Sequence, residues 1–217
     1  MQAIDISVNY DFICPWCRIG HLNLTSGIRA ANLPVPVSIE YVPFELNPTM
    51  PVDGMDRREY RTAKFGSWLR SQGMDAQVAA MGLAAGAQFN YDRVSRTPNT
   101  RLAHQLMQYA LSMGDARKTE ALYQSIFAAY FSEGCDIGVL GTLVDIAAKA
   151  GFDAATAEEY LLQNRGLATV LAAQRLTQQQ GVRSVPTVFI AGEAISGAQP
   201  PAVFAGALRA ALGRSTA

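Results

Sequence analysis

The sequence has few cysteines and histidines, no excess of either charge and no long apolar run. These absences argue against several classes of protein. Its 217 residues include three Cys and two His, too few cysteines for a scaffold stapled by disulfides. Lys and Arg together number 18, as do Asp and Glu, so the formal net charge is zero. A neutral chain without a basic block offers no electrostatic footprint for nucleic acid or an anionic membrane. We therefore expect its partners to be small molecules or other proteins.

Targeting segments are also missing from the sequence. Met1–Ser7 contains no basic stretch followed by an apolar one, as a secretory signal would have. No run of about 18 apolar residues exists, so no transmembrane helix is expected. These features predict a cytoplasmic protein. In such a reducing compartment a Cys-x-x-Cys pair is more often catalytic or metal-binding than structural.

The two ends of the chain carry the strand patterns. Apolar residues alternate with polar ones over 4–10, which is typical of a strand. A helix is expected to begin at Cys14-Pro15, because proline is favoured at the first helical position, and to end near Ala31. A second strand is expected over 37–42. Strand, helix and strand so close together indicate a βαβ unit with parallel strands.

The middle of the chain, residues 56–180, is rich in Ala, Leu, Gln and Arg, and its apolar residues fall at helical spacing. Roughly six helices are expected, with breaks at Gly73, Pro98-Asn99, Gly114-Asp115, Glu133-Gly134 and Gly151-Phe152-Asp153.

Strand patterns return at 185–190 and 194–196, before a last amphipathic helix over about 202–212. The predicted class is therefore α/β, with βαβ and ββα halves that form one sheet. Residues 1–55 and 181–217 would form this domain, and 56–180 an all-helical domain inserted between its halves.

Cys14 and Cys17 are the first candidates for chemistry. Three residues apart in a helix's first turn, they lie on one face, close enough for a disulfide. The helix N-terminus places partial positive charge near Cys14, which favours its thiolate, the attacking species in thiol–disulfide exchange. Cys17, one turn further in, would be less exposed. Pro15 lacks an N–H that would be unsatisfied there anyway and stiffens the turn between the cysteines.

Two other interpretations of this pair stay open. The cysteines can be buried thiols without chemistry, or they can ligate a metal together with His21, which lies four residues after Cys17. Zinc usually takes four ligands from two separated pairs. No second pair is present, so we expect no metal site.

Ser184-Val185-Pro186-Thr187 is the second candidate stretch. Because proline cannot donate to a strand ladder, Pro186 belongs at a strand start or edge. A cis bond would make a tight, fixed bend there and leave the backbone of Val185 free to pair with a bound peptide or thiol. A trans proline that starts a strand agrees equally well with the spacing.

The two stretches together resemble thioredoxin-like proteins, and the helical insertion makes the chain resemble the DsbA-like oxidoreductases, in particular their FrnE-type branch. The matching segments are Asp11–Gly20, Pro43–Pro48, Pro98–His104, Ala129–Gly134, Gly181–Thr187 and Ser196–Gln199.

This resemblance implies a thioredoxin fold interrupted by a helical domain, and a thiol–disulfide oxidoreductase acting on protein or small-molecule thiols. It implies that Cys14 is the nucleophile, Cys17 the resolving thiol and Pro186 a cis-proline, with the Val185 backbone contacting the substrate. No cofactor is expected to be required, and glutathione is a candidate redox partner.

Kappa-class glutathione transferases and 2-hydroxychromene-2-carboxylate isomerases share the architecture but typically have serine where Cys14 stands. A glutathione-dependent isomerase or transferase acting on a small aromatic or polyketide-like molecule is therefore the alternative function. A metal-binding or protein-interaction module is a third, non-enzymatic interpretation.

Several further residues have weaker assignments. Trp16 and Phe44 are expected to form an apolar lip of a substrate groove. His104 matches a family motif, and we expect it to pack on a helix and face the cleft rather than act as a base. Glu40 and Glu45 are each expected to be a solvated edge carboxylate, with a buried proton shuttle for Cys17, at one of the two, as the other interpretation. We assign no role to Cys135, and leave a homodimer open.

Trp16 leads to a first testable prediction. DsbA-like oxidants usually carry histidine after the proline, where its charge stabilises the thiolate and makes the protein more oxidising. Trp16 has no charge to give, so we expect a less oxidising couple than that of the periplasmic enzymes. An equilibrium titration against glutathione measures it, and a potential as high as theirs would contradict the prediction.

Overall fold

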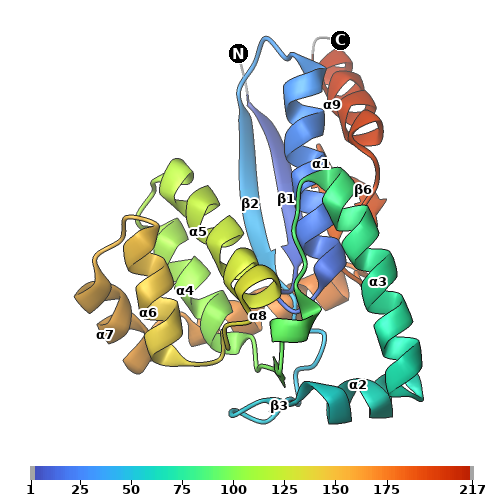
Figure 1. Ribbon diagram of the computed structural model, residues 1–217. Helices are drawn as coiled ribbons and strands as arrows, with labels where there is room; N and C mark the ends of the chain where they lie inside the picture. The colour runs from blue at the N-terminus through green and yellow to red at the C-terminus, as the bar shows by residue number, and fades with distance from the viewer. Residues whose placement is uncertain (1–2, 216–217) are drawn as a thin grey trace.

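A four-stranded sheet supports the candidate site in the computed structural model, which describes residues 3–215 (Figure 1). The strand order is β2-β1-β5-β6. β1 pairs in parallel with β2 and antiparallel with β5, which pairs antiparallel with β6. The strands are β1 (Ile4–Tyr10), β2 (Val37–Pro43), β5 (Thr187–Ile190) and β6 (Glu193–Ser196). Segments from both ends of the chain thus form one sheet, as the thioredoxin-fold prediction requires.

Helices cover both faces of this sheet. On one face, α1 (Pro15–Ala31) packs lengthwise against α9 (Pro201–Ser215). On the other, α8 (Leu167–Gln179) packs against β2, and the hydroxyl of Thr177 donates to Asn9 Oδ1 at 3.2 Å. Since side chains alternate along a strand, Val8 and Tyr10 point away from α8. Both are buried, with exposures of 2% and 0%.

The segment between β2 and β5 is mostly helical. Figure 1 shows α4 to α7 grouped on one side of the sheet, whereas α3 runs along the other side and packs on α1. Besides α8, its helices are α2 (Arg57–Phe65), α3 (Trp68–Ala85), a 3₁₀ turn (Tyr91–Arg93), α4 (Arg101–Ser112), α5 (Ala116–Ala128), a π-turn (Ala129–Glu133), α6 (Leu140–Lys149) and α7 (Ala154–Leu162).

The structure corrects two details of this segment. It is not entirely helical, because two-residue strands β3 (Met55–Asp56) and β4 (Arg96–Thr97) pair antiparallel. The helix break predicted at Gly73 is wrong, since α3 continues through it. Gly73 is not among the positive-φ glycines and an added Cβ there would meet nothing within 4 Å, so neither a turn nor a close approach requires glycine at this position. The break falls instead at Gly66, which ends α2 with φ of 89°. The outermost residues of the predicted sheet domain, 1–2 and 216–217, lie outside the described residues.

Gly54 explains why the short ribbon forms where it does. Its φ is +66°, a conformation that favours glycine, and a Cβ there would lie 2.6 Å from the carbonyl oxygen of Thr97. The missing side chain therefore lets the chain before β3 approach β4 closely. The ribbon leads directly into α2, whose N-cap Asp56 accepts a hydrogen bond from the Glu59 N–H at 2.9 Å.

Aromatic rings join α5 to the sheet and to α1. The ring of Tyr123 lies 4.8 Å from that of Tyr10 and 4.5 Å from those of Tyr41 and His21. Beside them, Glu120 Oε1 is 2.8 Å from His21 Nε2, and Glu120 Oε2 accepts a hydrogen bond from the Tyr41 hydroxyl. Partial burial raises the pKa of Glu120, but the hydrogen bonds from His21 and Tyr41 outweigh it and lower the pKa to about 2.

Glu120→Gln tests this contact through its pH dependence. A carboxyl group whose pKa is lowered in the folded protein stabilises it fully above its unfolded pKa and loses that contribution as pH falls through the folded value. We expect the variant to be less stable than the parent at pH 7, by an amount that shrinks as pH falls from 4.5, the ordinary value for glutamate, to about 2. Denaturant unfolding across this pH range measures the difference.

Glu158→Gln is the control, because Glu158 is exposed on α7 and forms no ion pair within the described residues. A loss in Glu120→Gln that stayed constant from pH 7 to pH 2 would contradict the electrostatic explanation.

Candidate active site

Cys14 occupies the N-cap position of α1, with Pro15 as the first helical residue. Its backbone N–H donates to the Asp11 carbonyl oxygen at 3.0 Å, and its own carbonyl accepts from the Cys17 N–H at 3.1 Å. These bonds close the turn between β1 and α1. Both thiols are free, and Cys14 is 5% exposed.

Cys17 lies behind Cys14 and is almost completely buried, at 1% exposure. Burial raises the pKa of the Cys17 thiol well above its usual value, and the neighbouring Cys14 and the charge of Asp11 raise it further. A hydrogen bond from the Asp11 backbone opposes these effects. A deeply buried thiol of this kind stays protonated at neutral pH until something accepts its proton.

The Val185–Pro186 peptide bond is cis and faces Cys14. The Cys14 thiol donates to the Val185 carbonyl oxygen, with 3.5 Å between sulfur and oxygen. The loop is fixed by the Thr187 hydroxyl, which donates to the Ser184 carbonyl at 2.8 Å. Gly20 lets α1 come close to it, because a Cβ there would lie 3.0 Å from Pro186 Cγ. Two stretches 171 residues apart thus meet at one sulfur atom.

A pocket of about 310 Å³ opens beside Cys14. The predicted residues Cys14, Pro15, Trp16 and Val185 all line it. Pro186 is buried and does not line the pocket. Other lining residues come from the inserted segment, mainly α2, α3 and the π-turn, and include Arg57, Tyr60, Arg61, Lys64, Met74, Asp75, Tyr91 and Phe131. The pocket therefore has one wall from the sheet domain and one from the insertion.

Phe44 and His104, the two other residues expected at a groove, do not line this pocket. Phe44 is 9% exposed, and its backbone N–H donates to the Tyr10 carbonyl at 2.9 Å. His104 is fully buried, with Nε2 3.5 Å from Asp11 Oδ1 and its ring 5.4 Å from that of Phe12. Both lie in the core beneath the turn that carries the cysteines.

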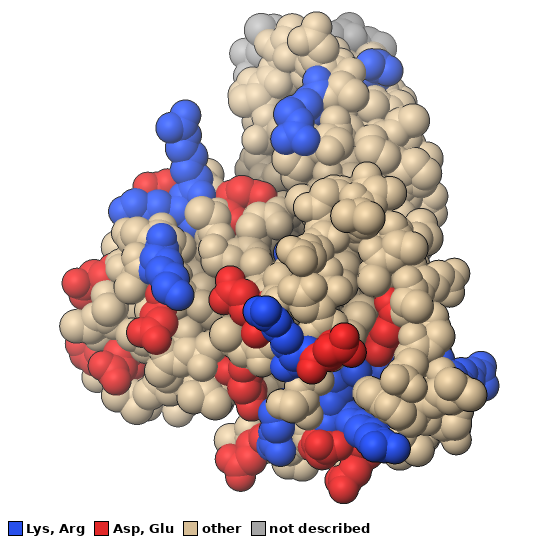
Figure 2. Space-filling view, in the orientation of Figure 1, with Lys and Arg blue, Asp and Glu red and all other residues tan. Residues whose placement is uncertain are grey.

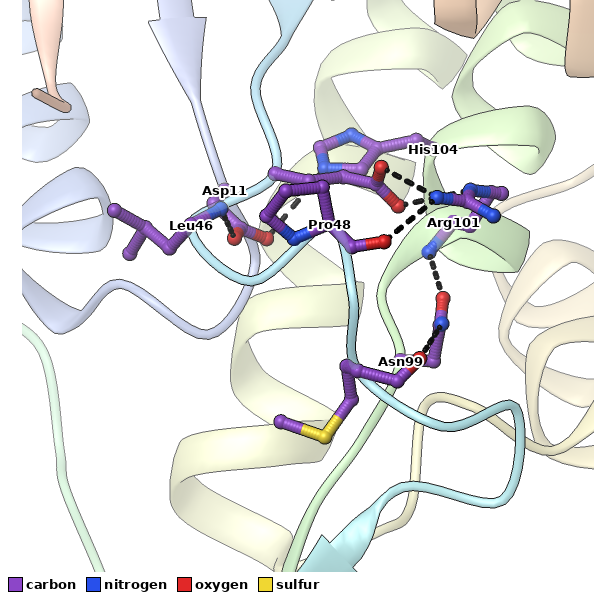
Figure 3. A network of polar contacts seen from close by, with 8 residues as sticks. Asp11, Leu46, Pro48, Asn99, Arg101 and His104 are labelled. Atoms are coloured by element: carbon purple, nitrogen blue, oxygen red, sulfur yellow. Dashed lines mark hydrogen bonds and ion pairs between the residues drawn. The ribbon is translucent and has the colours of Figure 1, made fainter. Parts of the chain in front are cut away.

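Asp11 links this turn to the loop that follows β2, as Figure 3 shows. Its side chain is fully buried, and Oδ2 accepts a hydrogen bond from the Leu46 N–H at 2.7 Å. In the same loop, Glu45 accepts two hydrogen bonds from Arg101 of α4, one from Nε at 3.1 Å and one from Nη2 at 2.9 Å. Glu45 is 6% exposed, so the expectation of a solvated carboxylate is wrong for it. The loop is held between the cysteine turn and α4.

Arg18 is a buried contact that sequence reasoning missed. It follows Cys17 on α1, and its Nη1 donates to the Gln88 carbonyl at 2.7 Å and to the Ser132 hydroxyl at 2.9 Å. Its guanidinium lies 5.2 Å from the centre of the Phe89 ring. Arg18 thus joins the first turn of α1 to a loop and to the π-turn of the insertion.

The basic side chains of α2 were also missed, although the sequence carries a signal for them. Arg57, Arg61 and Lys64 are spaced four and three residues apart, which places them on one helix face. All three line the pocket beside Cys14. Spacing identifies the shared face, but only the tertiary structure shows that it points toward the cysteines.

Other parts of the described chain bear on the remaining expectations. Cys135 is partly buried, with its sulfur 3.9 Å from Glu133 Oε2, and lies outside the pocket. Within residues 3–215, no three His, Cys, Asp or Glu side chains are grouped to hold a metal ion. Over the same residues, no helix has the length and apolar character to cross a membrane.

The strand order and the pairing of a Cys-x-x-Cys helix start with a proline loop define a thioredoxin fold. Residues 5–209 match the family model of the DSBA-like thioredoxin domain, and the chain belongs to this family. An uncharacterized protein of Bacillus subtilis (strain 168), YwbO, is 27% identical over 205 residues, which are 94% of each chain.

Solved structures extend this likeness. The chain is similar to a probable DsbA oxidoreductase of Streptomyces coelicolor, SCO1869, with 27% identity and a TM-score of 0.88, over 97% of this chain and 90% of that one. A 2-hydroxychromene-2-carboxylate isomerase shares the fold at 16% identity and a TM-score of 0.71, over 98% and 96% of the two chains. The cytosolic disulfide reductase DsbM of Pseudomonas aeruginosa, solved with glutathione, also shares the fold. Its sequence identity is 18% and its TM-score 0.69, over 96% of this chain and 99% of that one.

Asp11→Asn tests the electrostatic link between Asp11 and Cys17. The substitution removes a buried negative charge that raises the Cys17 pKa but keeps an oxygen to accept the Leu46 hydrogen bond. We therefore expect the pKa of Cys17 to fall. Cysteine ¹³Cβ NMR shifts followed against pH, with Cys14 and Cys135 replaced by serine in both proteins, measure it.

Glu45→Gln in the same background is the matched control, since Glu45 is a buried carboxylate on the adjoining loop that does not contribute to the Cys17 shift. An unchanged or higher Cys17 pKa in Asp11→Asn would rule out the link.

Proposed function

We propose that the chain is a thiol–disulfide oxidoreductase that exchanges electrons with protein or small-molecule thiols through Cys14 and Cys17. The observation that carries this proposal is the position of the Cys14 sulfur at a helix start, 3.5 Å from the carbonyl oxygen before a cis-proline and open to a pocket. A backbone edge beside the sulfur can pair with whatever chain or thiol is bound there.

The two cysteines have different tasks in this reaction. The Cys14 thiolate attacks one sulfur of a bound disulfide, whose S–S bond breaks, and the first thiolate leaves with the electron pair. Cys17 then loses its proton and attacks Cys14, which releases the second thiolate and leaves a Cys14–Cys17 disulfide. Two electrons pass from the protein to the substrate, and the reverse sequence oxidises a dithiol. The burial of Cys17 delays its attack until its proton is accepted.

The comparisons support the choice of chemistry and of redox partner. SCO1869 is described as a probable DsbA oxidoreductase, and DsbM as a cytosolic disulfide reductase that was solved with glutathione. We therefore propose glutathione as a redox partner, a cytoplasmic location and no other required cofactor. Membership of the FrnE-type branch and the domain boundaries at 55/56 and 180/181 stay predictions, as does homodimer formation.

The isomerase alternative is less well supported. The isomerase structure shares the fold, but the family resemblance associates that activity with serine at the first cysteine position. Here the pair is intact, and Cys17 is held directly behind Cys14. A buried second thiol has no task in a reaction that needs only bound glutathione.

Cys17→Ala distinguishes the two activities. In an oxidoreductase it removes the thiol that resolves the mixed disulfide, so covalent adducts through Cys14 should accumulate and turnover should fall by at least about tenfold, since resolution becomes intermolecular. An isomerase would keep most of its activity. Intact-protein mass spectrometry after reaction with oxidised glutathione, with and without reductant, measures the adduct.

Cys135→Ser is the control and should behave as the parent, because Cys135 lies outside the pocket. The oxidoreductase proposal fails if Cys17→Ala forms no adduct while retaining its fold, or if Cys14→Ser forms as much adduct as Cys17→Ala.

A further inference from the structure

The wall that α2 contributes to the pocket beside Cys14 is basic. Arg57, Arg61 and Lys64 reach it from one face of α2, and Figure 2 shows Lys and Arg atoms gathered over that helix. Arg57 is 3% exposed, so its guanidinium is almost completely shielded from bulk solvent. Cations that are shielded from water are unfavourable unless an anion lies close to them.

Asp75 of α3 neutralises part of this positive charge. Its Oδ2 accepts from Arg57 Nη2 and its Oδ1 from Arg61 Nη2, each at 2.7 Å. One carboxylate thus serves two guanidinium groups. Of the described residues that line the pocket, Asp75 is the only Asp or Glu.

Lys64 has no carboxylate partner at all within the described residues. Its Nζ lies 2.7 Å from the Tyr60 hydroxyl and 3.5 Å from Asn47 Oδ1, both of which are neutral. Three cations and one anion therefore face the pocket, an excess of two positive charges in a chain whose formal net charge is zero.

Two further observations show that this excess is not fully compensated by the protein. Burial and the neighbouring Arg57 lower the pKa of Arg61, and Asp75 opposes only part of this shift. Its Nε and Nη2 donate to Ser71 and Asp75, whereas its Nη1 has no hydrogen bond within the described residues. The Tyr91 hydroxyl, also in the pocket wall, is buried and has no hydrogen-bond partner in the described part of the chain. An anionic oxygen in the pocket would satisfy both groups.

We propose that the pocket binds a small disulfide or thiol that carries carboxylate groups, and that Arg61 and Lys64 bind a carboxylate while the substrate sulfur meets Cys14. This assignment rests on the proposed oxidoreductase function and names its substrate class. The pocket's volume, about 310 Å³, is at the lower end of the roughly 300–1,000 Å³ typical of small-molecule sites. Its size and charge together favour a compact acidic molecule over a folded protein surface.

In the proposed step the Cys14 thiolate attacks the near sulfur of the acidic disulfide. The S–S bond breaks, the far half leaves as a thiolate with the electron pair, and the near half stays as a mixed disulfide. Cys17 then displaces it, so that the protein loses two electrons and the substrate becomes two thiols. The cations take no part in these bonds and act only by holding the carboxylate.

A series of three disulfides of similar size but different charge tests the proposal. The reduced protein is mixed with dithiodipropionate, which is anionic, bis-hydroxyethyl disulfide, which is neutral, and cystamine, which is cationic. Each rate is divided by the rate of the same disulfide with dithiothreitol, which removes differences in intrinsic reactivity. We expect the normalised rates to fall from the anionic to the neutral to the cationic compound.

Lys64→Gln should lower the anionic rate by roughly three- to fivefold, the effect of losing one partly exposed charge pair, and lower the neutral rate by less. Arg58→Gln is the matched control, because Arg58 lies on the same helix and carries the same charge but does not line the pocket. Salt near 1 M, where the screening length is about 3 Å, should reduce the parent's preference as well.

The outcomes separate the two proposals. Equal normalised rates for all three disulfides, or equal losses in Lys64→Gln and Arg58→Gln, would overturn the carboxylate site while leaving the redox function intact. If none of the disulfides reacts with the parent protein but thiol titration shows that Cys14 is reduced and accessible, the oxidoreductase proposal itself fails.

Discussion

Asp11 joins the segments on which the geometry around the cysteines depends. Its backbone carbonyl accepts the Cys14 N–H, its carboxylate accepts the Leu46 N–H, and its other oxygen faces His104 at 3.5 Å. Removing a carboxylate from water costs several kcal/mol unless polar partners surround it. The cysteine turn, the loop after β2 and α4 are therefore held in one arrangement, because displacing any of them would leave a buried charge with fewer partners.

The helix that carries the thiols also fastens the insertion. Cys17 and His21 are four residues apart on α1, and His21 meets Glu120 and Tyr123 of α5. Arg18, on the next face, binds the loop at Gln88 and the π-turn at Ser132. Contacts on two sides of α1 thus fix the inserted helices relative to the thiols. This explains how a pocket with one wall from each part of the chain can have a definite shape.

Much of this arrangement could be predicted from the sequence, because it depends on local rules. The alternation of apolar and polar residues predicted the strand at 4–10, and the preference of proline for the first helical position predicted the start of α1. The charges of the pocket could not be placed in this way, since the spacing of Arg57, Arg61 and Lys64 identifies a face but not what it faces. The depths of Phe44 and His104 likewise depend on packing between distant segments, which a shared motif does not reveal. The helix break predicted at Gly73 was wrong because an exposed helix tolerates a glycine at a cost of only about 1 kcal/mol.

The cationic side chains of the pocket lie on α2 and not between the two cysteines. A charge between the two cysteines would act on the Cys14 thiolate and so on the redox potential, but Pro15 and Trp16 carry none. In this structure the cations that line the pocket lie on α2, where Asp75 of α3 partly neutralises them. If they hold the substrate carboxylate as proposed, substitutions on α2 would change which substrates are bound without altering the Cys-Pro-Trp-Cys turn. In that proposal, substrate choice and the sequence between the cysteines can change separately.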